Sequence, residues 1–290
     1  MMVLGLFRFS GHATELLLTS EDIHAVVGEP ARVRPELPDR QLKVVSWNIQ
    51  QGVRYEAIRD TLETLDADIY LLQEVDAGAR RSRYRQVAAA LADHLQMNWV
   101  FAGEFQEIGQ ARRNGSAVTG QAVLSRFPIS NAVALPFENQ AGLRWQLDPL
   151  QPRRGGRMAV RVETAGLVLY NAHIESARND DFRLKQVEEL VVDHLDSPRA
   201  SRPVVVAGDL NTSLPPERSP VVEGLKAGGF MDALGAVVSG RRTSIRHQDP
   251  LDWIFVRNVD AHGGRVIEVP KASDHYPLEV SLSGRSIALN

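Results

Sequence analysis

An unbroken apolar run that leads straight into polar residues, at positions 203–211, most constrains how this chain can fold. Residues 204–206 are three successive valines, and such a run of β-branched residues is typical of a buried strand. Gly208 is expected to end the strand, and Asp209 and Asn211 follow where the chain leaves the sheet. Side chains two residues apart in an extended segment point the same way, so both can meet groups from other strands. An Asx turn explains one of these polar residues well and the second less well.

The same pattern recurs at other predicted strands. Apolar, β-branched or alternating stretches predict strands at residues 42–49, 68–72, 99–101, 120–124, 129–135, 158–164, 167–173, 251–256 and 276–280. Polar residues stand at or beside an end of five of them: Asn48, Glu74, His173, Asp252, and Asp274 with His275. Because ligands and catalytic groups gather at the ends of sheet strands, we expect these side chains to meet Asp209 and Asn211.

Helical periodicity is expected in four segments, at 54–65, 80–95, 180–195 and 221–227. The second of these begins with a dense run of arginines between Arg80 and Arg85, which is either a solvated helix face or a phosphate-facing patch. Residues 136–156 include Trp145 and lack a regular pattern. Because loops of this length are uncommon unless they bind something, we interpret this stretch as a substrate-side loop.

Length and apolar content allow a large buried core. With 290 residues, 43% of them apolar, and no strong linker, one large α/β domain is favoured over two ordinary ones. Residues 1–40 have a modest helical pattern around 16–27 and then a proline-rich piece, so we expect an N-terminal extension. The domain is expected to occupy residues 41–290.

Composition excludes several classes of protein. The chain has no cysteine, which excludes disulfides, thiolate nucleophiles and sulfur-based zinc sites, so a metal must be held by oxygen and imidazole. Its net charge of -3 gives no global basic field for nucleic acid. There is no signal-peptide pattern and no run of ~18 apolar residues, so we expect no membrane span and a cytoplasmic location. Nothing indicates an obligate protein partner.

The chemistry that suits these strand ends is hydrolysis of a phosphate ester assisted by a hard divalent cation. Mg²⁺ prefers oxygen ligands, keeps several waters and needs only one or two carboxylates. Glu74, helped by Asn48 and Asp274, would be enough to hold it. The two histidines, His173 and His275, can donate hydrogen bonds to phosphate oxygens as negative charge builds on them.

Seven short motifs, in this order, resemble those of the endonuclease/exonuclease/phosphatase superfamily, which includes deoxyribonuclease I, apurinic endonucleases, bacterial sphingomyelinases and inositol polyphosphate 5-phosphatases. The resemblance spans about residues 42–283, and its motifs are Ser46-Trp47-Asn48, Leu72-Gln73-Glu74-Val75, residues 120–125, Asn171-Ala172-His173, residues 208–211, residues 251–255 and Ser273-Asp274-His275. It implies a deoxyribonuclease I-like α+β fold, a four-layer sandwich of two mixed β-sheets flanked by helices, with a metal site at one end of the sheets.

The resemblance also implies a role for each residue. Glu74 would be the principal ligand of Mg²⁺, for which Mn²⁺ can substitute, with Asn48 as a second ligand or its organiser. Asp274 would touch the metal directly or through water. Asp209 would orient and deprotonate the attacking water. The remaining residues would act on the phosphate: Asn211 would hold it, His275 would stabilise the transition state with Asp252 keeping it charged, and His173 would contact phosphate where apurinic endonucleases carry tyrosine.

The sequence leaves the substrate open. Arginines in the expected loops favour DNA or RNA, and hence an endo- or exonuclease, whereas the acidic pI of about 6.3 and the lack of an aromatic and basic groove oppose it. A phospholipid headgroup or another small phosphodiester fits equally well. The main enzymatic alternative is a phosphomonoesterase, and a more remote one is a non-catalytic scaffold that binds phosphorylated partners.

Overall fold

The computed structural model describes residues 23–29, 41–140, 145–146, 152–176, 180–212, 215, 218–235, 242–248 and 250–283. The apolar residues at 16–18, the proline-rich piece at 30–40 and the side chain of Trp145 lie outside the described part. The helical pattern expected around 16–27 is wrong where it can be compared, because β1 (Val26–Glu29) is a strand that pairs with β4 (Asn98–Glu107).

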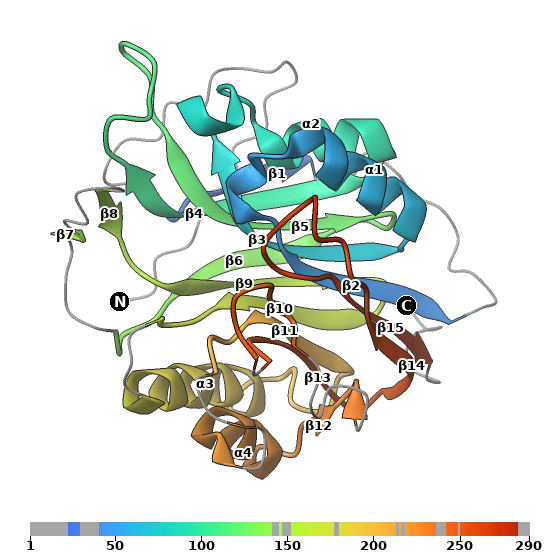
Figure 1. The fold of residues 1–290 in the computed structure, drawn as a ribbon. Coiled ribbons are helices and arrows are strands. Elements are labelled where there is room, and N and C mark those ends of the chain that lie inside the picture. Colours follow the sequence, from blue (N-terminus) through green and yellow to red (C-terminus); the bar gives the residue numbers. More distant parts are fainter. Residues whose placement is uncertain are drawn as a thin grey trace.

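Two mixed β-sheets form the centre of the molecule (Figure 1). The larger sheet has the order β14 (Asp260–Val266), β15 (Leu278–Ser283), β2 (Leu42–Asn48), β3 (Ile69–Ala77), β5 (Val118–Ser125), β4, β8 (Arg153–Gly155) and β7 (Trp145–Gln146). The smaller sheet has the order β12 (Met231–Asp232), β13 (Asp252–Arg257), β11 (Val204–Asp209), β10 (Leu167–His173), β9 (Met158–Thr164) and β6 (Ser130–Pro136). Each sheet contains one parallel pair, β2 with β3 and β10 with β11.

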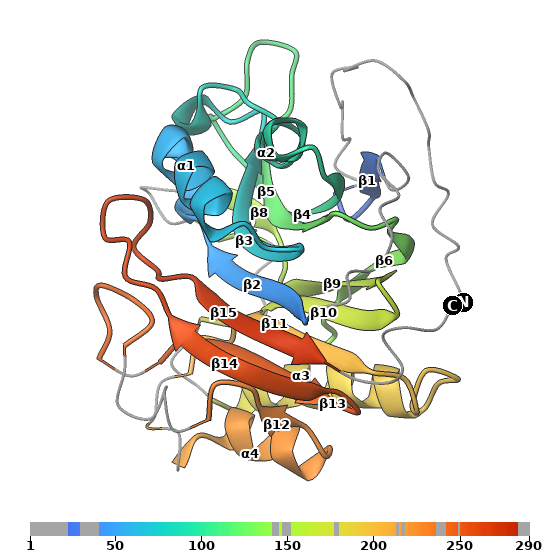
Figure 2. The ribbon, with the colours of Figure 1, turned by 90° about the vertical axis from the view of Figure 1, so that its right-hand side faces the viewer.

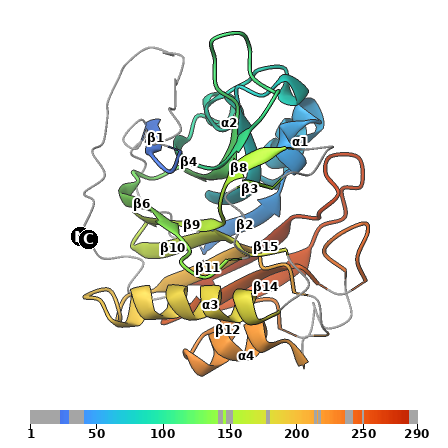
Figure 3. The ribbon, with the colours of Figure 1, turned by 90° about the vertical axis from the view of Figure 1, so that its left-hand side faces the viewer.

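Helices cover the outer face of each sheet. α1 (Tyr55–Leu65) and α2 (Val87–Leu95) lie outside the larger sheet, and α3 (Asp180–Leu195) and α4 (Pro220–Ala227) lie outside the smaller one (Figures 2 and 3). The four-layer sandwich expected from the sequence is therefore confirmed. Among the described residues, no helix has both the length and the apolar character needed to cross a membrane.

The alternation of side chains along β2 shows how the layers are built. Leu42 and Val44 belong to the core between the two sheets, whereas Val45 and Trp47 belong to the core under α1 and α2. The valines at 204–206 are fully buried because β11 lies inside its sheet, with the second sheet on one face and helices on the other. Polar Asn48 at the end of β2 thus points into the space between the sheets.

Two local predictions need correction. The helix expected over 80–95 begins only at Val87, and the arginine run forms a short 3₁₀ helix, η2 (Arg80–Ser82), followed by two residues with positive φ, Arg83 and Tyr84. The run is therefore a loop, not a helix face. The stretch 136–156 is not wholly irregular either, since β8 joins the larger sheet by pairing with β4. The strands expected at 158–164 and 167–173 are confirmed as β9 and β10, and they form a hairpin that turns at Ala165 and Gly166.

Candidate active site

Asp209 is the last residue of β11, one position beyond the end expected from the sequence. Gly208 does not end the strand but lets it approach β10, because its φ is 146° and a Cβ there would lie 1.8 Å from the carbonyl oxygen of Ala172. The backbone N–H of Asn211, whose φ is 44°, donates to Asp209 Oδ1 over 3.0 Å, which is an Asx turn. The turn uses only one carboxylate oxygen, and Asn48 Nδ2 donates to the other, Oδ2, over 3.0 Å from the opposite sheet.

Strand register brings the polar ends of the smaller sheet side by side. His173 on β10 is the partner of Asp209 in the parallel ladder, and Asp252 on β13 is its partner in the antiparallel one. Three predicted residues are thus neighbours across three strands. The structure gathers six of the eight in one buried cluster, which consists of Asn48, His173, Asp209, Asn211, Asp252 and His275.

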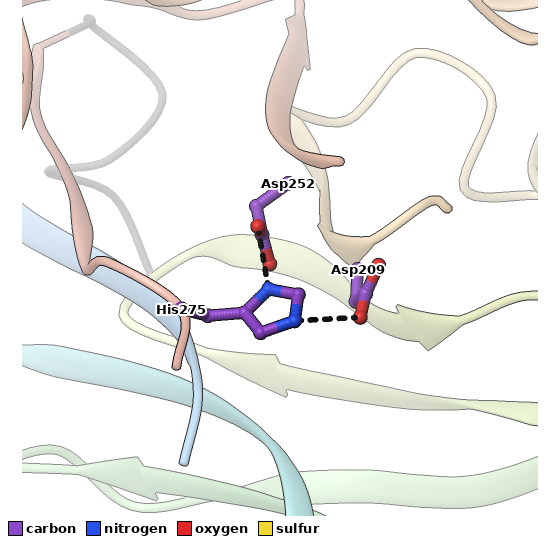
Figure 4. A group of neighbouring side chains, drawn as sticks. All are labelled: Asp209, Asp252 and His275. Atoms are coloured by element: carbon purple, nitrogen blue, oxygen red, sulfur yellow. Dashed lines mark hydrogen bonds and ion pairs between the residues drawn. The ribbon is translucent and has the colours of Figure 1, made fainter. Parts of the chain in front are cut away.

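His275 lies between two carboxylates (Figure 4). Its Nδ1 is 2.8 Å from Asp252 Oδ2, and its Nε2 is 3.8 Å from Asp209 Oδ2. The hydroxyl of Thr243 donates to the same Asp252 oxygen over 2.7 Å. The indole N–H of Trp47 donates to the carbonyl of His275 over 2.9 Å, so β2 holds this loop in place.

The charges in this cluster stabilise one another. Burial opposes the charged form of His275, but Asp252 and Asp209 outweigh it and raise the pKa of the imidazole to about 10. Burial also opposes the ionised form of Asp209, yet the charges of His275 and His173 and the hydrogen bond from Asn48 hold its pKa below 3.8. At neutral pH the cluster therefore contains a protonated imidazole beside an ionised carboxylate.

On the other side of Asp209 lies His173, which is 3% exposed. Its Nε2 is 3.6 Å from Asp209 Oδ2, and its Nδ1 is 3.5 Å from Glu104 Oε2. Glu104, on β4, is itself paired with Arg157 over 3.0 Å. The two imidazoles thus flank one carboxylate oxygen, each with a second carboxylate behind it.

Sequence reasoning missed Glu104 and Thr243. The only signal for Glu104 is a carboxylate inside a stretch of strand residues, where burial is costly without a partner. Arg157, the partner of Glu104, was not predicted as a buried residue, and it is 4% exposed. Nothing in the sequence distinguishes Thr243 from other threonines.

Glu74 lies in a bulge of β3. The strand expected to end beside it continues to Ala77, so that prediction of the strand end is wrong. The register between β3 and β5 shifts between Leu72 and Val75, and Glu74, with a φ of 51°, lies in the shift. A bulge re-aims a side chain within a strand. The half-buried carboxylate accepts a hydrogen bond from Gln51 and contributes to raising the pKa of His275.

Two groups of side chains are candidates for a metal site. Among the described residues, Asp209, Asp252 and His275 have ligand atoms within 4.8 Å of one another. Asp252 Oδ2 in this group is already bonded to His275 Nδ1 over 2.8 Å and to the hydroxyl of Thr243 over 2.7 Å, so the group forms a hydrogen-bonded cluster. Glu74 has a free carboxylate oxygen beside the bond from Gln51, and Asn48 Oδ1 accepts one bond, from Gln50 N–H, and has a second lone pair.

These oxygen donors fit a hard divalent cation, which needs few carboxylates. Asp274 is the least integrated of the eight predicted residues. Its carboxylate is 23% exposed and lies 3.9 Å from Arg246 Nε, and its backbone carbonyl accepts hydrogen bonds from Ile245 and Ser244. It is joined to the cluster through its neighbour, His275.

Comparisons with known proteins show the family and the fold of the chain. The model of the Endonuclease/Exonuclease/phosphatase family matches residues 45–275. No curated protein sequence matches the chain. The human Nocturnin catalytic domain, solved with a sulfate anion, has a TM-score of 0.64 at 18% identity and covers 86% of this chain and 97% of its own.

Two further solved structures have the same fold. An AP endonuclease from Archaeoglobus fulgidus has a TM-score of 0.57 at 16% identity, with 82% of this chain and 98% of that chain covered. A mannosyl-6-phosphatase from Bacteroides thetaiotaomicron has a TM-score of 0.56 at 16% identity, with 84% and 100% covered. At such identities the likeness concerns the fold alone.

Proposed function

The chain belongs to the endonuclease/exonuclease/phosphatase family, and on this premise we propose that it hydrolyses a phosphodiester by in-line attack of water. Members of the family are hydrolases that act on phosphate esters and generally depend on a divalent metal. The observation that carries the proposal is the position of Asp209 Oδ2 between the Nε2 atoms of His173 and His275, at 3.6 and 3.8 Å. Both distances exceed a normal hydrogen bond, which leaves room for a reacting oxygen to share these groups.

Asp209 acts as the base. Its pKa is held below 3.8, so the carboxylate is ionised at neutral pH and can orient a water and accept its proton. Asn48, which donates to the same oxygen, fixes the direction in which the carboxylate points. The Asx turn with Asn211 fixes the other oxygen.

The histidines act on the phosphoryl oxygens. His275 is protonated at neutral pH and held by Asp252, so it donates to an oxygen on which negative charge develops. His173, with Glu104 behind it, donates a hydrogen bond to a phosphoryl oxygen from the opposite side. Asn211 donates one amide hydrogen to the carbonyl of Ile174 and keeps the second for the scissile phosphate.

We propose that Glu74, with Asn48 and Asp274, holds Mg²⁺, for which Mn²⁺ can substitute. When bound, the cation would neutralise negative charge on the phosphate and on the leaving oxygen. The bulge at Glu74 directs an oxygen ligand toward the strand ends instead of along the ladder. No covalent intermediate is needed, since the chain has no cysteine and the base adjoins the place of the water.

The proposal is tested by incubating the purified chain with Mg²⁺ or Mn²⁺ and a panel of substrates. The panel contains bis-p-nitrophenyl phosphate, p-nitrophenyl phosphate, single-stranded and plasmid DNA, sphingomyelin and inositol phosphates. We expect hydrolysis of phosphodiesters that EDTA abolishes. Asp209→Asn should lower kcat by about 10²–10⁴, the usual contribution of a general base.

A matched control is Asp232→Asn, which changes a half-buried aspartate on β12 that accepts the backbone N–H of Leu234. It should leave kcat unchanged, because that carboxylate belongs to a turn. Normal turnover in Asp209→Asn would remove this residue from the mechanism. Hydrolysis of monoesters alone would make the chain a phosphomonoesterase, and no hydrolysis of any substrate would leave a phosphate-binding scaffold.

A further inference from the structure

Two neighbouring loops concentrate positive charge in a chain whose net charge is -3. Residues 78–86 connect β3 to α2, and residues 108–117 connect β4 to β5. Together they contain no aspartate or glutamate and six arginines, which are Arg80, Arg81, Arg83, Arg85, Arg112 and Arg113. The loop between β4 and β5 projects beyond the larger sheet at the end of the molecule that carries α1 and α2 (Figures 1 and 2).

The two loops are docked on each other. The backbone N–H of Arg80 donates to the carbonyl of Gln110 over 2.8 Å, and the guanidinium of Arg112 lies 4.5 Å from the centre of the Tyr84 ring. Gly78, with a φ of 76°, permits the close approach, because a Cβ there would lie 2.5 Å from the carbonyl oxygen of Ser116. The loops therefore form one surface.

Arg81 anchors this surface from below. Its guanidinium donates to both oxygens of Asp76, each over 2.8 Å, and lies 3.0 Å from Glu107. The side chain of Arg81 therefore pairs with interior carboxylates and does not belong to the exposed surface. This arginine is followed by Arg83 and Tyr84 in left-handed conformation, with φ of 57° and 59°. Such residues cost on the order of 1 kcal/mol each and persist where the surroundings hold them, so the surface is preorganised.

Four arginines remain exposed to solvent on these loops: Arg80, Arg83, Arg112 and Arg113. The side chain of Arg83 is 76% exposed, and the nearest carboxylate, that of Glu56, is 4.0 Å away. Arg85 differs, because it pairs with Glu56 over 2.9 Å and covers the ring of Tyr55. We call the four exposed arginines, with the half-buried Tyr84, the arginine platform.

A series of contacts links the platform to Glu74, and its last step is the 4.0 Å between Glu56 and Arg83. Gln51 in η1 (Gln50–Gly52) donates to Glu74, and η1 leads directly into the first turn of α1. There Tyr55 and Glu56 contact Arg85. A chain lying along this surface would pass from Glu74 over η1 and the start of α1 to the platform.

Given the proposed phosphodiesterase activity, on which this step rests, we infer that the arginine platform binds the sugar-phosphate backbone of a nucleic-acid strand beside the phosphate that is cleaved. Arginines fixed in two separate loops can be engaged together by a polymer with repeated phosphates, but not by one small ester. Guanidinium groups also fit phosphate oxygens in a forked geometry, and Tyr84 adds a ring on which a base can stack.

The test compares two double variants with the same change in charge. Arg83→Glu with Arg112→Glu alters the platform, and Lys185→Glu with Lys226→Glu alters exposed lysines on α3 and α4, outside the other sheet. Binding of a fluorescein-labelled single-stranded DNA oligonucleotide is measured by anisotropy in EDTA over a series of NaCl concentrations. The platform variant should bind at least about tenfold more weakly, with a salt slope smaller by about 1.4, or about 0.7 for each lost contact.

Hydrolysis of bis-p-nitrophenyl phosphate separates this inference from the proposed function. Both double variants should hydrolyse it like the wild type, because none of the four residues touches the site. An equal loss of DNA binding in the lysine variant, or an unchanged salt slope in the platform variant, would overturn the inference. So would platform-dependent binding to phosphatidylserine vesicles without DNA binding, which would assign the surface to a membrane. If the chain bound DNA through the platform but hydrolysed no substrate, the DNA-binding role of the platform would stand and the proposed phosphodiesterase activity would be refuted.

Discussion

Two buried clusters of charged side chains, both next to β3, differ in how many of their polar atoms form hydrogen bonds. Glu74 and Asp76 are only two residues apart on β3, yet the bulge directs the first toward the candidate active site and leaves the second under the arginine platform. Around Asp76, the guanidinium of Arg81 and the hydroxyl of Thr119 satisfy both carboxylate oxygens at hydrogen-bond distance. We call this group the Arg81 hub.

In the candidate site, by contrast, Asp209 Oδ2 has one normal hydrogen bond, from Asn48, and two imidazole nitrogens beyond hydrogen-bond distance. The pKa directions also differ. Burial outweighs Arg81 and raises the pKa of Asp76, whereas the histidines and Asn48 hold the pKa of Asp209 low. The comparison teaches that buried charge alone is a poor criterion for a functional site. A better one is a buried carboxylate oxygen that lies beside imidazoles without being fully hydrogen-bonded.

The largest effect should come from breaking the pair of His275 and Asp252. His275→Ala and Asp252→Ala should each lower kcat for bis-p-nitrophenyl phosphate by about 10²–10⁴, the size of a proton-transfer contribution. The double variant should lose little more than either single variant, because the carboxylate acts by keeping the imidazole charged and in place. Steady-state kinetics of the three variants and the wild type measures this coupling.

Independent, multiplicative losses in the double variant would show that Asp252 acts separately from His275. Because the pair is buried, Asp252→Asn serves as a second variant that keeps the shape of the side chain and its contact with Thr243. Urea unfolding of each variant shows whether the loss of kcat is accompanied by a loss of folded protein.

Breaking the Arg81 hub should lower the stability of the fold and leave kcat unchanged, unlike breaking the pair of His275 and Asp252. Arg81→Met leaves the buried carboxylates of Asp76 and Glu107 without their guanidinium, and removal of one partner from a buried ion pair costs about 3–5 kcal/mol. We expect a loss of this order in the free energy of unfolding by urea. The kcat of the folded variant on bis-p-nitrophenyl phosphate should stay near that of the wild type.

Arg85→Met is the matched control for the hub. Its partner, Glu56, is 52% exposed, and exposed pairs contribute about 0–1 kcal/mol. If Arg81→Met instead lowered kcat as strongly as His275→Ala while leaving stability intact, the distinction between the two clusters would fail.

The polar strand ends that form the candidate site were easier to predict from the sequence than the geometry that brings them together. The polar ends of β2, β10 and β11 were predictable, because an apolar strand that ends in Asn48, His173 or Asp209 is a local pattern. The bulge at Glu74 was not predictable, since it depends on the register between β3 and β5, which are separated by η2, α2 and β4.

The structure of the arginine run at 80–85 could not be predicted for a similar reason, because it depends on contacts made outside the run. Composition and spacing predicted a helix from Arg80, but Arg81 is drawn into the interior by Asp76 and Glu107, and the chain then turns through two left-handed residues. Tertiary contacts outweighed helix propensity here. Glu104 was missed for a related reason, because its partners, Arg157 and His173, come from distant parts of the chain.

A third buried ionisable group, His194, sharpens the comparison, because the one carboxylate that favours its charged form, that of Asp193, is outweighed by burial and by two arginines. It is fully buried on α3, with its ring edge-on to Tyr170 and Phe230, at 6.2 Å between ring centres in each case. Burial, with the charges of Arg257 and Arg199, lowers its pKa from 6.5 to about 4 despite an opposing contribution from Asp193.

Because the folded pKa lies below the unfolded one, the unfolded chain binds more protons between these values, and stability falls as the pH drops. From pH 7 to pH 5 this residue should lower the free energy of unfolding by about 2 kcal/mol. His194→Phe should remove that part of the pH dependence in urea unfolding, whereas His262→Phe, at an exposed histidine on β14, should not. An undiminished pH dependence in His194→Phe would mean that this imidazole is protonated in the fold, as His275 is in the candidate site, and that burial does not keep a histidine neutral here.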